Sequence, residues 1–222
     1  KLANLALWIL LLTSVTSFLH HFITLFPNLP SVLAYHGMIM SWGTGIGAAL
    51  SIFTILATVW KHGIKPEPGL LAIFAGFVLY ILDGASAVVT SNVAWAFQLH
   101  GTMWQSGHTM TVLVAMALMW MGVLYHHYPV MTGRKLDPKL GNLFVKLCAF
   151  SCTAIAIVML MGGADGMPRR HADWVQGGWM VWGNWMLILG LVLGASYVVY
   201  AISLWKSRDI SASPVNAPEA AE

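Results

Sequence analysis

Residues 100–110 read HGTMWQSGHTM and lead into a long apolar stretch, so they place a candidate metal ligand, His108, inside a membrane segment. Met110 follows two residues later, and at about 100° per residue the two side chains point to nearly opposite faces of an α-helix. One helix can therefore serve two redox centres. An imidazole in hydrocarbon is costly and is usually kept for function, although a histidine near a helix end can instead hydrogen-bond to a neighbouring helix.

The composition indicates a membrane protein. The chain has 222 residues, of which 58% are hydrophobic and 9% are charged, and a helix needs roughly 20 apolar residues to cross a bilayer. Stretches of this kind lie at about 3–26, 31–60, 69–93, 104–128, 139–162 and 178–205. The sequence therefore predicts an all-α, polytopic membrane protein with one six-helix domain over residues 1–206. Residues 207–222 are polar and rich in Ala and Pro, which predicts a disordered cytoplasmic tail.

The eleven Lys and Arg residues predict the orientation in the membrane. If six helices alternate in direction, Arg169 and Arg170 fall on one side and all the other basic residues fall on the opposite side. By the positive-inside rule the basic side is cytoplasmic, and both termini lie there. The formal net charge of +3 then reflects topology and does not indicate a nucleic-acid partner.

A second pair of candidate ligands, His20 and His21, lies near the outer end of the first apolar stretch. Adjacent histidines on a helix diverge by about 100°, yet both imidazoles can swing toward one metal ion between them. Neutral imidazole suits copper, and a site with few ligands and an open position can bind a gas molecule. The alternative is a pair of interfacial histidines hydrated at the membrane surface.

Asp83 is a third candidate, because it stands about fourteen residues into its apolar stretch, which is roughly 21 Å at 1.5 Å per residue. A buried carboxylate of this kind suggests proton transfer or pairing with a basic group. The hydroxyls of Ser51 and Thr54 are further proton-transfer candidates. Ser and Thr in helices more often bond back to their own backbone, which is the simpler interpretation of both.

Arg169 and Arg170 are adjacent on the otherwise uncharged outer side. Bidentate binding of carboxylates that do not belong to this chain explains such a pair best. Pairing with Asp165 or Asp173 is the alternative. The two other adjacent histidines, at 126 and 127, fall at the opposite end of their helix, so they cannot share a site with the histidines at 20 and 21.

The order of these features resembles the second half of subunit I of the heme-copper oxidases, helices seven to twelve of that family's twelve. The resemblance rests on the paired histidines at 20 and 21, on a histidine eight residues before His108, on the Tyr125-x-x-x-Pro129-x-x-x-Gly133 helix exit, and on GMPRR at 166–170. It extends from residue 20 to residue 174 and is closest to the B-type members. It implies that these six helices form half of a twelve-helix bundle.

Carried over by position, the resemblance implies a function for each candidate ligand. His20 and His21 match the family's paired copper ligands, and His108 matches the axial ligand of the high-spin heme beside that copper. A heme-propionate-binding group would be formed by His100, Arg169 and Arg170.

Two departures from the family pattern follow. The family's third copper histidine, its cross-linked tyrosine and one ligand of its low-spin heme lie in helices one to six, which have no counterpart here. Met110 stands where the family has the other low-spin ligand, a histidine. A thioether can ligate heme iron and raises its potential relative to imidazole. The second, low-spin heme is therefore either bound through Met110 or lost.

The resemblance implies a terminal oxidase subunit in a prokaryotic cytoplasmic membrane that reduces O2 to water at a heme and copper site. A second membrane chain would supply the missing helices and the third copper ligand, and cytochrome c, a cupredoxin or a quinol would donate electrons. One alternative is a nitric oxide reductase-type subunit, which uses the same scaffold and which the His-Gly-Thr at 100–102 resembles. The other is a degenerate, non-catalytic heme-binding or assembly subunit, suggested by Met110.

Overall fold

A computed structural model describes residues 1–26, 28–62, 67–171 and 178–209. The long helices are α1 (Leu2–Ser17), α2 (Ser31–His62), α3 (Pro68–Ser91), α5 (Met103–Thr132), α6 (Pro138–Ala164) and α7 (Met180–Trp205). Two short elements join them: the 3-10 helix η1 (Phe18–Phe22) continues α1, and α4 (Val93–Leu99) lies between α3 and α5. Within these ranges, six helical segments are long and apolar enough to cross a membrane. This confirms the predicted all-α, polytopic membrane class.

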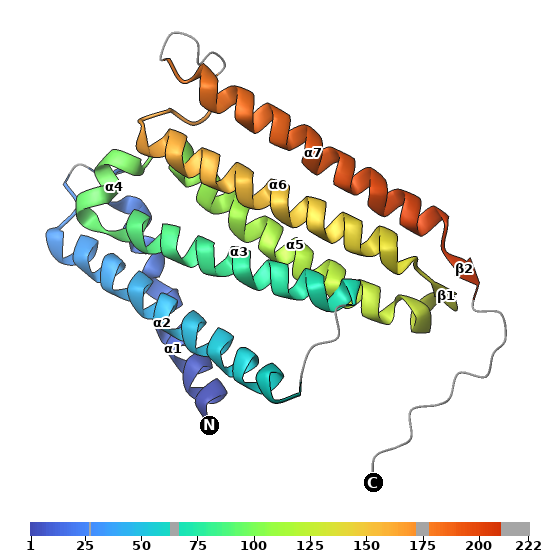
Figure 1. Cartoon of the computed structure of the whole chain (residues 1–222). Helices are drawn as coiled ribbons and strands as arrows, with labels where there is room; N and C mark the ends of the chain where they lie inside the picture. The colour runs from blue at the N-terminus through green and yellow to red at the C-terminus, as the bar shows by residue number, and fades with distance from the viewer. Residues whose placement is uncertain (27, 63–66, 172–177, 210–222) are drawn as a thin grey trace.

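Helices that follow one another in the chain pack side by side in opposite directions (Figure 1). The pairs α1 with α2, α3 with α5, α5 with α6, and α6 with α7 make the main contacts. One end of the bundle therefore collects η1, α4, the start of α5 and the loop after α6. We call it the histidine end, because His20, His21, His100 and His108 lie there. The N-terminus of α1 lies at the opposite end.

The core lies between α3, α5 and α6, where Leu79, Leu118 and Phe144 are almost completely buried. Glycines bring α3 and α5 into close contact: a Cβ at Gly76 would lie 2.7 Å from the Ala115 carbonyl oxygen. Small residues permit this approach between membrane helices, where dispersion contacts rather than water exclusion hold the bundle together. The close contact fixes α3 against α5 and so positions the side chains at the histidine end.

The first apolar stretch differs from the prediction in its last turns. The α-helix expected over 3–26 ends at Ser17 and tightens into η1, so His20 and His21 lie in a 3-10 helix, a frequent form of helix ends. The backbone of α2 presses against this segment, since a Cβ at Gly37 would lie 2.5 Å from the His20 nitrogen. Proline at position 27 also disfavours helical geometry in the preceding residue.

The segment 94–103, which lies between two of the predicted apolar stretches, contains most of α4. The Asn92 side chain caps this helix by accepting a hydrogen bond from the Ala94 nitrogen at 2.9 Å, a preferred role for asparagine. Ala96 of α4 is buried with Ile23 and Ala34. The short helix therefore covers η1 and the start of α2.

The structure describes the first three residues of the predicted tail, 207–209. The short strands β1 (Arg134–Lys135) and β2 (Arg208–Asp209) pair antiparallel, and the buried Ser207 accepts a 2.8 Å hydrogen bond at its carbonyl oxygen from Arg134 Nη2. Residues 207–209 are thus part of the fold. Residues 210–222 lie outside the described residues, and disorder there stays a prediction.

Candidate functional site

The start of α5 is held in place by a cap and by the loop that follows α6. The Thr102 side chain caps the helix by accepting from the Trp104 nitrogen at 3.2 Å. On the other side, the Met103 nitrogen donates to the Met167 carbonyl at 2.8 Å, and the Arg169 nitrogen donates to the Gly101 carbonyl at 3.0 Å. The GMPRR loop is therefore bonded directly to the turn that precedes His108.

His108 lies in the second turn of α5 and faces α3. Its Nδ1 is 2.7 Å from Oδ1 of Asp83, a carboxylate that is only 6% exposed. The distance is that of an ion pair or hydrogen bond, but the ring N–H is not aligned with Oδ1, which has no hydrogen-bond partner in the described chain. Ser86 Oγ lies 3.4 Å from the same nitrogen. The other ring nitrogen, Nε2, has no hydrogen-bond partner among the described residues.

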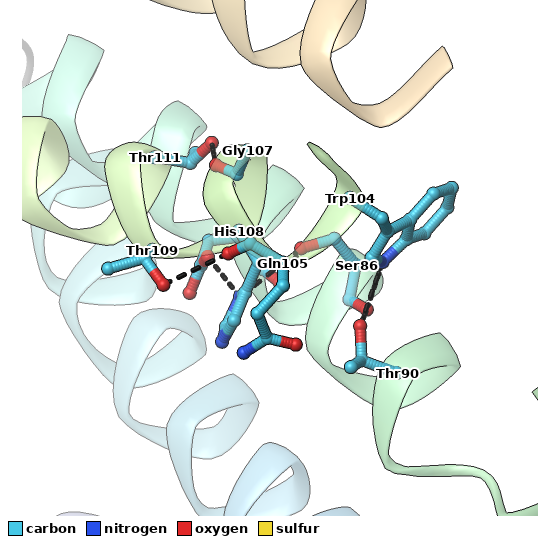
Figure 2. A network of polar contacts seen from close by, with 9 residues as sticks. Ser86, Thr90, Trp104, Gln105, Gly107, His108, Thr109 and Thr111 are labelled. Carbon is cyan, nitrogen blue, oxygen red and sulfur yellow. Dashed lines mark hydrogen bonds and ion pairs between the residues drawn. The ribbon is translucent and has the colours of Figure 1, made fainter. Parts of the chain in front are cut away.

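A short network locks α3 and α5 together beside this pair. The Trp104 Nε1 donates to Thr90 Oγ1 at 2.8 Å, and Thr90 Oγ1 donates to the Ser86 carbonyl at 2.9 Å (Figure 2). The Ser86 hydroxyl in turn donates to the Asp83 carbonyl at 2.8 Å. These contacts restrain both the helix that carries the carboxylate and the helix that carries the imidazole.

His20 and His21 lie face to face in η1, with ring centroids 4.0 Å apart and planes inclined by 35°. His20 Nδ1 is 2.6 Å from the Ser17 carbonyl oxygen, and since a carbonyl only accepts, Nδ1 carries the proton and donates. The Ser41 hydroxyl lies 2.8 Å from the same nitrogen. The basic nitrogen of His20 is therefore Nε2. Both histidines are close enough to His108 to interact with it electrostatically.

The donor set fits heme and copper. A histidine that ligates a metal usually engages its other ring nitrogen with a carbonyl or carboxylate, which orients the ring; His20 does so with Ser17, and His108 has Asp83 beside its Nδ1. Buried polar atoms normally have partners, yet Thr24 Oγ1 and Gln105 Oε1 have none within the part of the chain that the structure describes. Among those same residues, no three His, Cys, Asp or Glu side chains come together as a metal site.

His100 is the C-cap residue of α4 and lies near both His21 and Arg169 of the GMPRR loop. Its ring centroid is 6.5 Å from that of His21. Burial and the nearby Arg169 guanidinium lower the pKa of His100 below its usual value, which favours the neutral ring. The positive charge of Arg169 also acts on His21.

Neither adjacent arginine uses Asp165. The Asp165 carboxylate accepts from Trp182 Nε1 at 3.2 Å, and no Asp165 ion pair with Arg169 or Arg170 forms in the described chain. The other alternative partner, Asp173, lies outside the described residues. Arg170 has a left-handed backbone with φ of 60°, which is uncommon for a residue with a side chain and turns the chain directly after Arg169.

Within the described residues, no hydrogen bond joins the remaining sequence candidates to this cluster. Met110 is half-buried two residues beyond His108. Ser51 and Thr54 donate to their own helix, to the Gly47 carbonyl at 3.0 Å and the Leu50 carbonyl at 2.8 Å. The adjacent histidines at 126 and 127 lie at the far end of α5, where position 126 borders a cavity of about 650 Å³ between α3 and α5.

The sequence analysis did not identify the hydroxyl groups that contact the candidate ligands. Ser86 and Thr90 follow Asp83 at i+3 and i+7, which is the spacing of one helix face. This polar stripe in an apolar helix was the available signal. Ser17 and Ser41, which hold His20, had no comparable signal because they come from different helices.

Comparison with known proteins identifies the scaffold. The family model for cytochrome c and quinol oxidase polypeptide I matches residues 1–193. The chain belongs to this family. Cytochrome c oxidase subunit 1 of Debaryomyces hansenii is 32% identical over 166 residues, which cover 74% of this chain and 30% of that protein. Probable cytochrome c oxidase subunit 1-alpha of Streptomyces coelicolor is 23% identical, covering 87% of this chain and 33% of the relative.

A solved heme-copper terminal oxidase dimer shares the fold, with a TM-score of 0.81 and 19% identity over 92% of this chain and 41% of the other. The resemblance to subunit I drawn from the motifs is therefore confirmed. The chain spans about a third of the length of these curated relatives, so it corresponds to part of a subunit I polypeptide.

Proposed function

We propose that this chain contributes half of the subunit I bundle of a terminal oxidase that reduces O2 to water at a heme and copper site shared with a partner membrane chain. The observation that carries the proposal is the convergence of His20, His21 and His108, from two helices far apart in sequence, at one end of the bundle. Family membership supports the reaction class.

Each site residue would have a distinct role. His108 would hold the heme iron through Nε2, and His20 and His21 would hold copper. Bound heme and copper would together supply the electron-rich centre for O2 reduction. Ser17 and Ser41 orient the His20 ring by their contacts with Nδ1. Arg169 and Arg170, which use no carboxylate in the described chain, would bind the heme propionates together with His100.

The partner chain would supply the missing helices and the third copper ligand. Side chains on α1 such as Leu5, Trp8 and Leu12 are more than half exposed, which supplies apolar surface for lipid or for the partner's helices. Cytochrome c, a cupredoxin or a quinol would donate the electrons.

The proposed orientation places both termini on the cytoplasmic side of a prokaryotic membrane, because nine of the eleven basic residues fall on the side opposite the histidines when the six helices alternate. Reporter fusions in the loop at 133–137 test it. Activity of a periplasmic reporter at that loop would reverse the orientation.

Metal analysis and an absorption spectrum of the complex purified from its native membrane test the function. If the chain is an oxidase subunit, the purified complex should contain heme together with copper. Heme with non-heme iron would instead assign a nitric oxide reductase-type subunit. Heme alone, or no metal, would assign a degenerate subunit, the reading that Met110 suggests.

A further inference from the structure

The surroundings of Asp83 favour a more specific role than proton transfer. It is buried in α3, and no Lys or Arg side chain pairs with it in the described chain. Its Oδ1 lies 2.7 Å from His108 Nδ1. A carboxylate inside a bilayer is costly unless it has a partner, and the imidazole is the partner that the structure provides.

Asp83 contacts His108 at Nδ1, the ring nitrogen that does not bind the metal when a histidine ligates through Nε2. Nδ1 and Nε2 stand on different edges of the ring, so a carboxylate at Nδ1 leaves Nε2 available for a metal. The ring N–H is not aligned with Oδ1 in this structure. Hydrogen bonds of functional groups are often poorly aligned outside the reacting complex, and the 2.7 Å separation of the two atoms is within hydrogen-bond distance.

We propose that Asp83 is a positioning residue that makes His108 a stronger electron donor to the heme iron; this rests on the proposed function, in which His108 is the axial ligand. A carboxylate that accepts the Nδ1–H hydrogen bond draws the proton toward itself and makes Nε2 more basic. Charge-assisted bonds of this kind are roughly twice as strong as neutral ones.

Two features distinguish this arrangement from a merely satisfied buried acid. Ser86, the other group near Nδ1, is a neutral hydroxyl at 3.4 Å and already donates to the Asp83 carbonyl at 2.8 Å. The carboxylate is thus the nearer and stronger acceptor for the imidazole. The Trp104 and Thr90 contacts hold the two helices in this register, so the pair is fixed by the fold.

The test compares Asp83→Asn and Asp83→Glu with the unchanged protein in the assembled complex. An amide preserves the size of the side chain but removes its charge, so Asp83→Asn should lower the iron–histidine stretching frequency of the reduced heme and raise its midpoint potential. It should also weaken heme retention about 10- to 100-fold, as loss of such supporting contacts does. Asp83→Glu should restore the frequency and potential toward those of the unchanged protein. Ser86→Ala is the matched control and should shift the band less than Asp83→Asn.

An unchanged frequency and potential in Asp83→Asn would overturn the proposal and leave Asp83 a purely structural group. If Asp83→Asn loses its heme, the test is made on the unchanged protein. Its iron–histidine stretching frequency should lie above that of a heme–imidazole compound whose N–H has no acceptor. Equal frequencies would overturn the proposal. Failure of the proposed function itself is seen separately, because His108→Ala would then keep a normal heme spectrum.

Discussion

Gly163 of α6 lies against the backbone of Trp104 at the start of α5, so closely that a Cβ on residue 163 would overlap the Trp104 nitrogen. The contact lies beside the Thr102 cap and one turn before His108. It makes a small residue on α6 a determinant of where the candidate heme ligand stands.

Gly163→Ala should therefore displace the first turn of α5 and cost about 1–3 kcal/mol, as overpacking does. Thermal unfolding of the purified complex and its heme content measure the effect. Gly190→Ala on α7 is the matched control, because a Cβ there meets no atom within 4 Å, and its stability and heme content should stay unchanged. Equal behaviour of the two variants would show that α6 does not position α5.

Replacing His20 or His21 with Ala should remove copper while leaving heme bound. The reason is that the two rings form one pair, 4.0 Å apart, whereas His108 lies on another helix. The copper-to-heme ratio of the purified complex measures this. His127→Ala, at the other end of α5, should keep the normal ratio. Copper at its full level in both His20→Ala and His21→Ala would exclude these residues as ligands.

Replacing both Arg169 and Arg170 with Leu should lower heme retention, since a propionate left unpaired near the membrane costs several kcal/mol. Dialysis against a heme-binding protein, followed by the heme-to-protein ratio, measures the loss. Replacement by two lysines should lose less heme than replacement by two leucines, because charge is kept while the bidentate geometry is lost. Lys206→Leu, an exposed residue at the opposite end, is the control. Unchanged heme in the double leucine variant would leave the arginines without this role.

The sequence predicted the spans and the depth of the candidate ligands because both depend on length and on the alternating direction of the helices. Counting apolar residues places His20 and His21 late in one helix and His108 early in another of opposite direction. That arithmetic needs no knowledge of how the helices rotate about their axes. It correctly separated His126 and His127 from the site.

The sequence could not predict how each helix is rotated about its own axis. α5 is apolar nearly all round, so no periodic pattern indicates that His108 turns toward Asp83 of α3. The close approach of α3 and α5 at Gly76 sets this rotation, and no single stretch of the sequence contains that contact. α4 was missed for a related reason: it is a short helix whose stability comes from burying Ala96 against η1 and α2 rather than from its own length.

The most direct test of the whole account is the heme spectrum and oxygen consumption of the complex carrying His108→Ala. If His108 is the axial ligand, as proposed, the variant should lose the high-spin heme signal and its oxygen consumption, whereas loss of a histidine that only packs would cost about 1 kcal/mol of stability. A normal heme spectrum with normal oxygen consumption in that variant would contradict the account.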